Sequence, residues 1–279
     1  MIDIENIENE NVKKIVKKNL IGAKKKSFIS FIYRTLKILK NNFIFFLKNQ
    51  IDKEKFQHEE RKITYDNHWS IRSDIKNYVW YIYKNSYFIA NGSLSQEIFI
   101  NFIETKIKDP NVKSILEIGC GNGFNIFPLS EKFPNKKFTG VDISSTAIKN
   151  CEKKLSLQNN KNLSFFERNA EKLDFHKNSF DLIYTVLALE QMQEIKDKVI
   201  ENINYISSGN IILIEPFKDV NKNFLNKFHM KSSNYLDLSY RDLNRYNLTI
   251  IEKLENFPQK VGLSVSCLFL KKDNQIEKN

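Results

Sequence analysis

The sequence Ser114–Asn125, S-I-L-E-I-G-C-G-N-G-F-N, contains the pattern that decides the fold. Its residues Ile115–Ile118 are apolar apart from Glu117 and predict a short buried strand. Three glycines follow directly, with one residue between each: Gly119, Gly121 and Gly123. Glycine adopts positive φ readily and lets the backbone approach a ligand closely. The pattern therefore predicts a strand that ends in a ligand-binding turn.

A second apolar strand is predicted at Phe138–Val141, and it ends in the acid Asp142. A strand, a glycine turn, a helix and a second strand that ends in a carboxylate form a nucleotide-binding arrangement. We expect Asp142 to accept hydrogen bonds from both hydroxyls of a ribose. The glycine spacing is G-x-G-x-G, whereas a dinucleotide site requires G-x-G-x-x-G, so a dinucleotide-binding protein is disfavoured.

Two motifs carry a resemblance to a known family. L-E-I-G-C-G-N-G, which ends at Gly123, resembles the first motif of class I S-adenosylmethionine-dependent methyltransferases, and V-D-I-S, which begins at Val141, resembles their second. The resemblance implies that S-adenosyl-L-methionine is the cofactor and that the glycine turn holds its methionine part. The cofactor-binding residues expected from these motifs are Glu117, Gly119, Gly121, Gly123, Asp142 and Ile143.

Later segments resemble further motifs of that family in the expected order. Leu163–Phe166 and the following R-N-A-E are similar to the third motif, in which Asn169 and the amide of Ala170 would contact the adenine. The alternative for Asn169 is that it caps a turn. Phe180–Met192 resembles the fourth motif, a buried strand whose end faces the transferable methyl, and Asn210–Glu215 reads as a fifth strand.

These segments predict an α/β three-layer sandwich. The sheet is expected to have seven mostly parallel strands with an antiparallel last strand, and the final pair of strands is expected at Leu248–Lys253 and Leu263–Lys271. An N-terminal helical extension is added to it. The predicted division is a basic amphipathic helical extension at 1–60, a helical cap at 61–110, a methyltransferase domain at 111–272 with a cap insertion at about 217–247, and a tail at 273–279.

The N-terminal segment carries the excess positive charge of the chain. The net charge is +11, and residues 11–51 hold eleven basic side chains and no acid. Residues 24–50 predict a basic amphipathic helix, which could bind an anionic membrane, pack against protein, or, as the least favoured alternative, bind nucleic acid. Its uncharged runs are too short to span a bilayer. Residues 1–10 are expected to be disordered.

The cysteines and histidines predict neither a disulfide framework nor a metal site. Cys120, Cys151 and Cys267 form no C-x-x-C pair, and the histidines have no spacing typical of metal ligands. We therefore expect no metal and a reducing cytoplasmic location, with attachment to the cytosolic face of a membrane if residues 24–50 bind lipid. The oligomeric state is left open.

Two segments are candidates to cover the site. Tyr65, His68, Trp69 and Arg72 are expected to line a lid, with Tyr65 contacting the cofactor, and the aromatic run Tyr78–Phe88 is expected to continue a helical cap. The simpler alternative is that these aromatic residues only pack the cap. A second cover is expected from the insertion after the fifth strand, above the carboxyl ends of the sheet.

The chemistry expected from the resemblance needs a positioned acceptor and a proton acceptor. Candidates for the base are Glu190, Glu215 and His229, while Gln191 stands where relatives carry a histidine. The apolar end of the fourth motif favours a small-molecule or lipid-linked acceptor, with O-methylation of a saccharide or lipid-linked intermediate preferred. The alternatives are methylation of RNA or protein, and a catalytically idle binding or scaffold relative.

Overall fold

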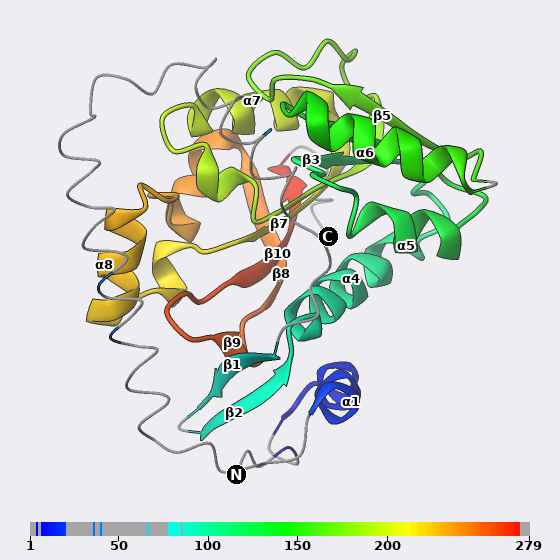
Figure 1. Cartoon of the computed structure of the whole chain (residues 1–279). Coiled ribbons are helices and arrows are strands. Elements are labelled where there is room, and N and C mark those ends of the chain that lie inside the picture. Colours follow the sequence, from blue (N-terminus) through cyan, green and yellow to red (C-terminus); the bar gives the residue numbers. More distant parts are fainter. Residues whose placement is uncertain are drawn as a thin grey trace.

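One seven-stranded sheet dominates the computed structural model of this chain (Figure 1). The strand order is β5-β4-β3-β6-β7-β10-β8. Its strands are β3 (Ser114–Ile118), β4 (Lys137–Asp142), β5 (Leu163–Glu167), β6 (Phe180–Val186), β7 (Ser207–Glu215), β8 (Leu248–Leu254) and β10 (Ser266–Lys272). The structure describes residues 4, 7–20, 36, 40, 66, 78–84, 86–158 and 160–273.

The pairing confirms the predicted fold class. Strands β3 to β7 pair in parallel, and β10 is antiparallel to both β7 and β8. Alternate residues of a central strand lie in two different hydrophobic clusters: Ile115 belongs to one cluster and Leu116 to the other. Both faces of the sheet are therefore covered, which is the condition that a parallel sheet requires.

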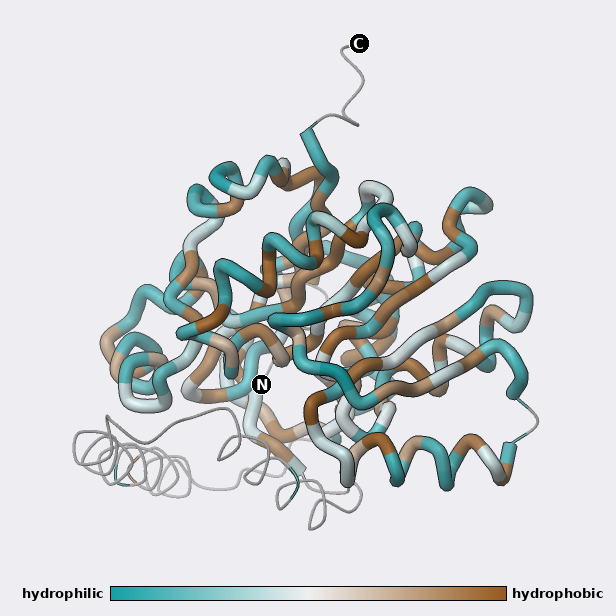
Figure 2. The backbone as a smooth tube through the Cα atoms, turned by 90° about the horizontal axis from the view of Figure 1, so that it is seen from above, coloured by the Kyte–Doolittle hydropathy of each residue, from teal (hydrophilic) through white to brown (hydrophobic). Residues whose placement is uncertain are grey.

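Helices form the two outer layers of the sandwich. On one face the sheet packs against α4 (Leu94–Ile107), α5 (Ile126–Lys132) and α6 (Ser145–Ser156). On the other face it packs against α7 (Lys196–Ile206) and the 3-10 segment η4 (Tyr240–Tyr246). Figure 2 shows apolar residues concentrated toward the middle of the molecule and polar residues along its outer helices.

The N-terminal residues are part of the core. Ile7, Val12 and Val16 are buried in the same cluster as α4, and Asn9 caps the helix α1 (Glu10–Asn19) by accepting from the N–H of Val12 at 3.1 Å. The prediction of disorder for residues 1–10 is thus wrong for residues 7–10. The prediction failed for a physical reason. Isolated apolar residues in a polar segment become buried only when they pack against a distant part of the chain, which here is α4.

The aromatic run expected to be helical forms a β-hairpin instead. Strands β1 (Tyr78–Tyr83) and β2 (Ser86–Asn91) are antiparallel, and β9 (Gln259–Lys260) adds a third strand beside β1. Lys84 takes a positive φ of 50° in the turn. Aromatic and β-branched side chains in succession fit a pleated surface better than a helix. Among the described residues 78–110, the helical part of the predicted cap is α4.

The insertion after β7 contains η3 (Lys218–Val220), α8 (Phe224–Ser232) and η4. Of residues 24–50 the structure describes only Leu36 and Lys40, so the predicted amphipathic helix lies outside the described residues. Within the part of the chain that the structure describes, none of the helices combines the length and the apolar character needed to cross a membrane.

Candidate functional site

The carboxyl edge of the parallel strands gathers most of the predicted site residues. The glycine turn follows β3, Asp142 ends β4, Asn169 follows β5, Glu190 follows β6 and Glu215 ends β7. Parallel strands place all of these ends at the same edge of the sheet, where open α/β sheets form their binding sites. The tertiary structure thus brings together residues that are spread over about 100 positions of the sequence (Figure 1).

The glycine turn is required by both conformation and packing. Gly119, Gly121 and Gly123 have φ values of 73°, 50° and 75°. A Cβ on Gly119 would lie 2.4 Å from the Cβ of Ala188, and a Cβ on Gly123 would lie 2.6 Å from the ring of Phe127. These two glycines therefore serve the close packing of the turn against the protein, which the spacing alone did not indicate.

Asp142 joins the first two motifs. Its Oδ2 accepts a hydrogen bond from the N–H of Gly121 at 2.8 Å, and its Oδ1 accepts one from the N–H of Ser144 at 2.9 Å. Burial raises the pKa of this carboxyl, and the backbone N–H groups act against the rise. Each carboxylate oxygen has two lone pairs, so both oxygens keep acceptor capacity for ribose hydroxyls. Ile143, the next residue, is half-buried.

Glu117 is a buried carboxyl that two side chains hold. The hydroxyl of Tyr184 donates to its Oε2 at 3.1 Å, and Nδ2 of Asn125 donates to its Oε1 at 3.0 Å. Burial raises the pKa of Glu117 to about 8. A buried carboxyl of this kind gains a charge when a cation approaches it, which fits the amino group of a methionine part. Sequence patterns did not indicate Tyr184 or Asn125 as its partners.

The third motif contributes a turn. Oδ1 of Asn169 accepts from the N–H of Glu171 at 3.0 Å, so the turn-capping alternative describes what its side chain does here. Ala170 is buried, and its carbonyl accepts from Nδ2 of Asn202 at 2.9 Å. Contacts from Asn169 and Ala170 to an adenine stay a prediction.

Glu215 holds the turn that follows β6. Its carboxylate is fully buried and accepts from the N–H groups of Ala188, Leu189 and Glu190 at 3.2, 3.0 and 3.0 Å. The same turn begins with Leu187, whose φ of 51° is unusual for a residue with a side chain. Three donors on one carboxylate stabilise this conformation. Glu215 is therefore placed to shape the turn, because both of its oxygens accept backbone N–H groups from it.

Glu190 differs from Glu215 in its hydrogen bonding, because only one of its two carboxylate oxygens has a partner among the described residues. The side chain is buried, with 7% of the residue exposed, and Oε1 accepts from Nε2 of Gln191 at 3.0 Å. Its Oε2 has no hydrogen-bond partner in the described part of the chain. Burial, with the neighbouring Glu215 charge, raises the pKa of Glu190 to about 8, and burial alone raises that of Glu215 to about 7. An unpartnered buried carboxylate oxygen is costly and indicates a missing partner.

The remaining candidates fall into two groups. His229 lies on α8 with its ring edge-on to Tyr235, 5.5 Å between centroids, and burial lowers its pKa. Tyr65, His68, Trp69 and Arg72 lie outside the described residues.

Asp66 contacts the start of α6, which the sequence did not indicate. Its Oδ1 accepts from the N–H of Thr146 at 3.0 Å and from Oγ of Ser144 at 2.5 Å. It thus lies at the N-terminus of α6, where a carboxylate is favourable. Its charge adds to the rise in the pKa of Asp142. The only sequence signal was its position beside Tyr65 in the expected lid.

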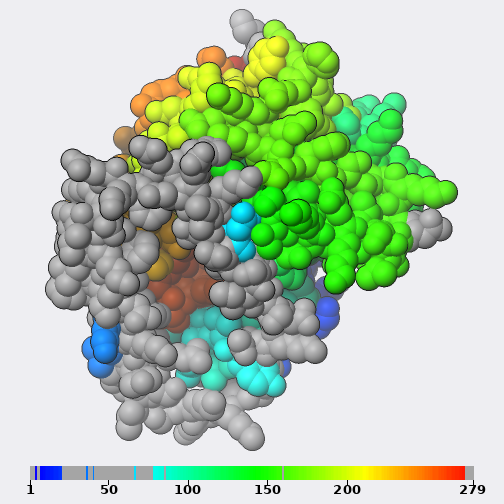
Figure 3. All heavy atoms as spheres, turned by 45° about the horizontal axis from the view of Figure 1, so that its top comes forward, coloured from blue at the N-terminus to red at the C-terminus, as the bar shows by residue number. Residues whose placement is uncertain are grey.

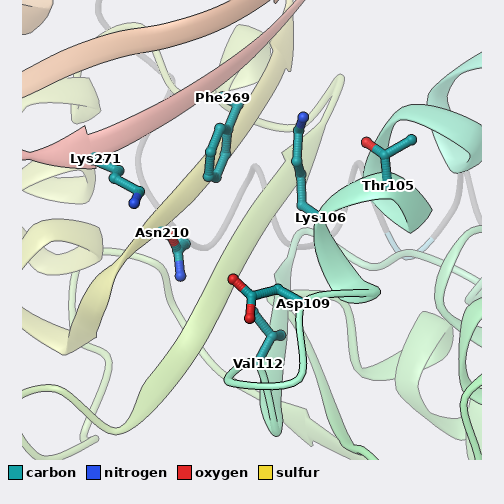
Figure 4. A pocket seen from close by; sticks show the side chains of 7 residues that line it. All are labelled: Thr105, Lys106, Asp109, Val112, Asn210, Phe269 and Lys271. Atoms are coloured by element: carbon teal, nitrogen blue, oxygen red, sulfur yellow. The ribbon is translucent and has the colours of Figure 1, made fainter.

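Other surface features do not form the site. A cleft of about 160 Å³ lies between α4 and the strands β7 and β10 (Figure 4) and is lined by Thr105, Lys106, Asp109, Val112, Asn210, Phe269 and Lys271. Asn210 and Lys271 pair near the amino end of β7, so the cleft is at the opposite edge of the sheet. The described residues contain no group of ligands that could hold a metal ion. Figure 3 shows one face of the molecule, on which the middle of the chain, in green, lies next to yellow and orange residues of the C-terminal part.

Comparisons with known proteins agree with this geometry. The sequence profile of a family described as "Methyltransferase domain" matches residues 110–264, more than half of the chain. Malonyl-[acyl-carrier protein] O-methyltransferase 2 of Ilyobacter polytropus is 33% identical over 106 residues, which are 38% of this chain and 40% of that protein. Phthiotriol/phenolphthiotriol dimycocerosates methyltransferase 1 of Mycobacterium ulcerans is 26% identical over 141 residues, 50% of this chain and 51% of that protein. The matched segments thus span about half or less of these curated relatives.

A solved structure shares the fold. Magnesium protoporphyrin IX methyltransferase from Synechocystis PCC 6803, solved with bound SAH, superposes with a TM-score of 0.50 at 14% identity, covering 64% of this chain and 81% of that chain. The family match covers the glycine turn and the acid that ends β4, which both lie within residues 110–264. The chain therefore belongs to the methyltransferase-domain family, whose enzymes take the methyl group from S-adenosylmethionine.

Proposed function

We propose that this chain binds S-adenosyl-L-methionine at the carboxyl edge of its sheet and transfers the methyl group to a small-molecule or lipid-linked acceptor, at an oxygen atom. The observation that carries the proposal is the bond from Gly121 to Asp142, which joins the glycine turn to the carboxylate at the end of β4. When bound, the cofactor supplies a methyl group activated by its sulfonium. The work of the protein is then to bind, align, exclude water and accept a proton.

The residues of the first two motifs are proposed to bind different parts of the cofactor. Asp142 is placed to accept from the ribose hydroxyls, since both of its oxygens keep acceptor capacity. Glu117, held by Tyr184 and Asn125, is placed beside the glycine turn for the methionine part. Ile143, Asn169 and Ala170 would complete the site around the adenosine.

Glu190 is the proposed proton acceptor. Its spare oxygen and a pKa of about 8 suit a group that takes a proton near neutral pH. Glu215 is a positioning residue, because its carboxylate orients the backbone N–H of Glu190. Glu190 is also the candidate that lies directly at the end of the fourth motif, where the acceptor has to meet the methyl.

Two features support an uncharged acceptor group of modest size. The turn beside Glu190 is formed by the apolar residues Val186, Leu187, Ala188 and Leu189, and the insertion with α8 and η4 follows the adjacent strand β7. The curated relatives are named as methyltransferases of malonyl-[acyl-carrier protein] and of phthiotriol/phenolphthiotriol dimycocerosates. We place the reaction in the cytoplasm, with a saccharide or lipid-linked hydroxyl as the preferred acceptor.

The test has two steps. Calorimetry should show binding of S-adenosylmethionine by the full chain, and radiolabelled cofactor incubated with fractionated cell extract should then give a labelled product. Label in an organic-soluble or saccharide fraction supports the proposed acceptor. Label in RNA or protein would show that the chain transfers methyl groups but that the proposed class of acceptor is wrong. Cofactor binding without label in any fraction would identify a catalytically idle relative.

A further inference from the structure

The outer face of α8 exposes large apolar side chains. Phe224 is 78% exposed and Leu225 is 40% exposed, and the two are adjacent in the first turn of the helix. The ring of Phe224 stacks on that of Phe228 at 6.4 Å between centroids. Single exposed apolar residues are ordinary, but neighbouring large ones indicate an interaction surface.

Lysines surround this apolar surface, and the stretch of chain that forms it contains no acid. Lys222, Lys227 and Lys231 are all exposed, and residues 221–234 contain no aspartate or glutamate. The next acid along the chain, Asp237, is ion-paired with Lys218. The surface is therefore both apolar and positively charged.

The opposite face of α8 attaches the helix to the protein. Asn226 and Met230 are buried, and Nδ2 of Asn226 donates to Oδ1 of Asn221 at 3.0 Å and to Oγ of Ser264 at 3.1 Å. Asn221 in turn donates to the carbonyl of Ser264 at 2.8 Å. The described attachment thus uses buried residues on the inner face of the helix.

We propose that the outer face of α8 is a docking surface for an anionic lipid bilayer. Phe224 and Leu225 would enter the boundary between headgroups and acyl chains, while Lys222, Lys227 and Lys231 meet lipid phosphates. The choice of partner rests on charge and apolar character together. The lysines complement the negative charge of an anionic membrane, and the exposed aromatic and aliphatic side chains complement its apolar interior. Figure 1 shows α8 away from the middle of the sheet.

This inference goes beyond the proposed methyl transfer and does not depend on it, because a bilayer can be bound without cofactor or acceptor. It is also separate from the predicted helix at residues 24–50. It has one consequence for the acceptor. Because α8 belongs to the insertion that directly follows Glu215, docking would place the carboxyl edge of the sheet close to the lipid.

The experiment measures partition of the full chain into vesicles without cofactor. Vesicles of phosphatidylglycerol and phosphatidylcholine in equal parts are compared with phosphatidylcholine alone. The double variant Phe224→Ser/Leu225→Ser and the triple variant Lys222→Gln/Lys227→Gln/Lys231→Gln should each weaken binding to the anionic vesicles by at least about tenfold, since each lysine contributes about fivefold. The triple variant should also depend less on salt than the wild type does.

Matched controls come from α6 and from Leu157, the residue that directly follows it, which carry the same kinds of side chain. Leu157→Ser removes an exposed apolar residue, 82% exposed, and Lys149→Gln/Lys153→Gln removes two exposed lysines. Both should leave partition at the wild-type level. Thermal unfolding of every variant checks that the fold is retained.

Direct insertion is measured with Phe224→Cys labelled with an environment-sensitive fluorophore. The native Cys120, Cys151 and Cys267 are buried, so the new cysteine reacts selectively. A blue shift on adding anionic vesicles, absent for labelled Leu157→Cys, supports docking. Wild-type partition by both α8 variants, or no shift at position 224, overturns it. Loss of RNA binding or of self-association in these variants, with vesicle binding intact, also overturns it and assigns the surface to that partner.

Discussion

Asp142 shows how one carboxylate can shape a site and keep capacity for a ligand. It receives N–H groups from two different segments, at Gly121 and Ser144, and so fixes the glycine turn relative to the end of β4. Glu117 and Glu215 accept hydrogen bonds at both oxygens in the same way, whereas one oxygen of Glu190 has no hydrogen-bond partner among the described residues. Differences in hydrogen bonding thus separate four acidic residues that look alike in the sequence.

The variant Asp142→Ala should weaken cofactor binding by at least about tenfold, because charge-assisted hydrogen bonds contribute about 1.5–3 kcal/mol each. Isothermal titration calorimetry with S-adenosylmethionine checks this. Asp219→Ala serves as a control, since Asp219 lies in η3 after β7. Unchanged affinity in a folded Asp142→Ala variant would show that the Asp142 carboxylate does not bind the cofactor.

The variant Glu190→Gln should reduce the rate of methyl transfer by about 10²–10⁴-fold if it accepts the proton. The residue must be ionised to act, so the wild-type rate should rise with pH toward a pKa of about 8, and the variant should lose this rise. The measurement is single-turnover transfer of label to the acceptor fraction at several pH values. A variant with the wild-type pH profile would exclude Glu190 as the base, and Glu201→Gln, an exposed acid on α7, is the matched control.

The variant Tyr184→Phe should lower the free energy of unfolding by about 1–3 kcal/mol, because it leaves an oxygen of the buried Glu117 without its donor. Urea unfolding measures the change. Tyr205→Phe, at an exposed tyrosine, should have no comparable effect. Equal stability of the two variants would mean that the Tyr184 bond contributes nothing measurable.

At the scale of elements, the segments outside the matched domain are integrated into it. Helix α1 packs on α4 through Val12 and Val16, Lys18 pairs with Glu97 at 3.0 Å, and β9 joins β1. The hairpin is thus linked to the C-terminal part of the chain. A chain that starts near Lys62 would lose the buried residues of α1, so such a truncation is expected to be less stable than the full chain.

The variant Ile7→Ala tests this packing at one position. Ile7 is buried among residues of the core, so the loss should be about 2–5 kcal/mol, as for other large-to-small changes in cores. Chemical unfolding checks it, with Ile251→Ala at an exposed position as the control. Stability of Ile7→Ala close to that of the control would show that residues before α1 add little to the core.

At the scale of the whole molecule, the buried carboxyls couple folding to pH. Glu117 and Glu190 have pKa values raised to about 8, and Glu215 has one raised to about 7. In the unfolded chain these groups ionise at the usual, lower pKa. Between the two values the folded state binds more protons, so its stabilisation is complete at low pH and is lost as pH rises.

The free energy of unfolding of the cofactor-free chain should therefore fall between about pH 5 and about pH 8. Urea unfolding across this range measures the slope. Glu117→Gln should make the slope shallower, while Glu201→Gln should leave it unchanged. A flat or rising profile in the wild type would contradict the raised pKa values.

Local patterns predicted the strand and glycine turn at Ser114–Gly123, the acid after β4 and the class of sheet, and the resemblance of the motifs to a known family implied the cofactor. These features depend on residues close together in the chain, where periodicity and spacing report directly on structure. Only the tertiary structure decided that Tyr78–Asn91 is a hairpin, that Ile7 is buried and that Tyr184 donates to Glu117. It also decided that one oxygen of Glu190, unlike those of Glu215, has no hydrogen-bond partner among the described residues. Each of these depends on a partner at least 25 residues away or on the register between strands, and a pattern read along the chain does not contain that information.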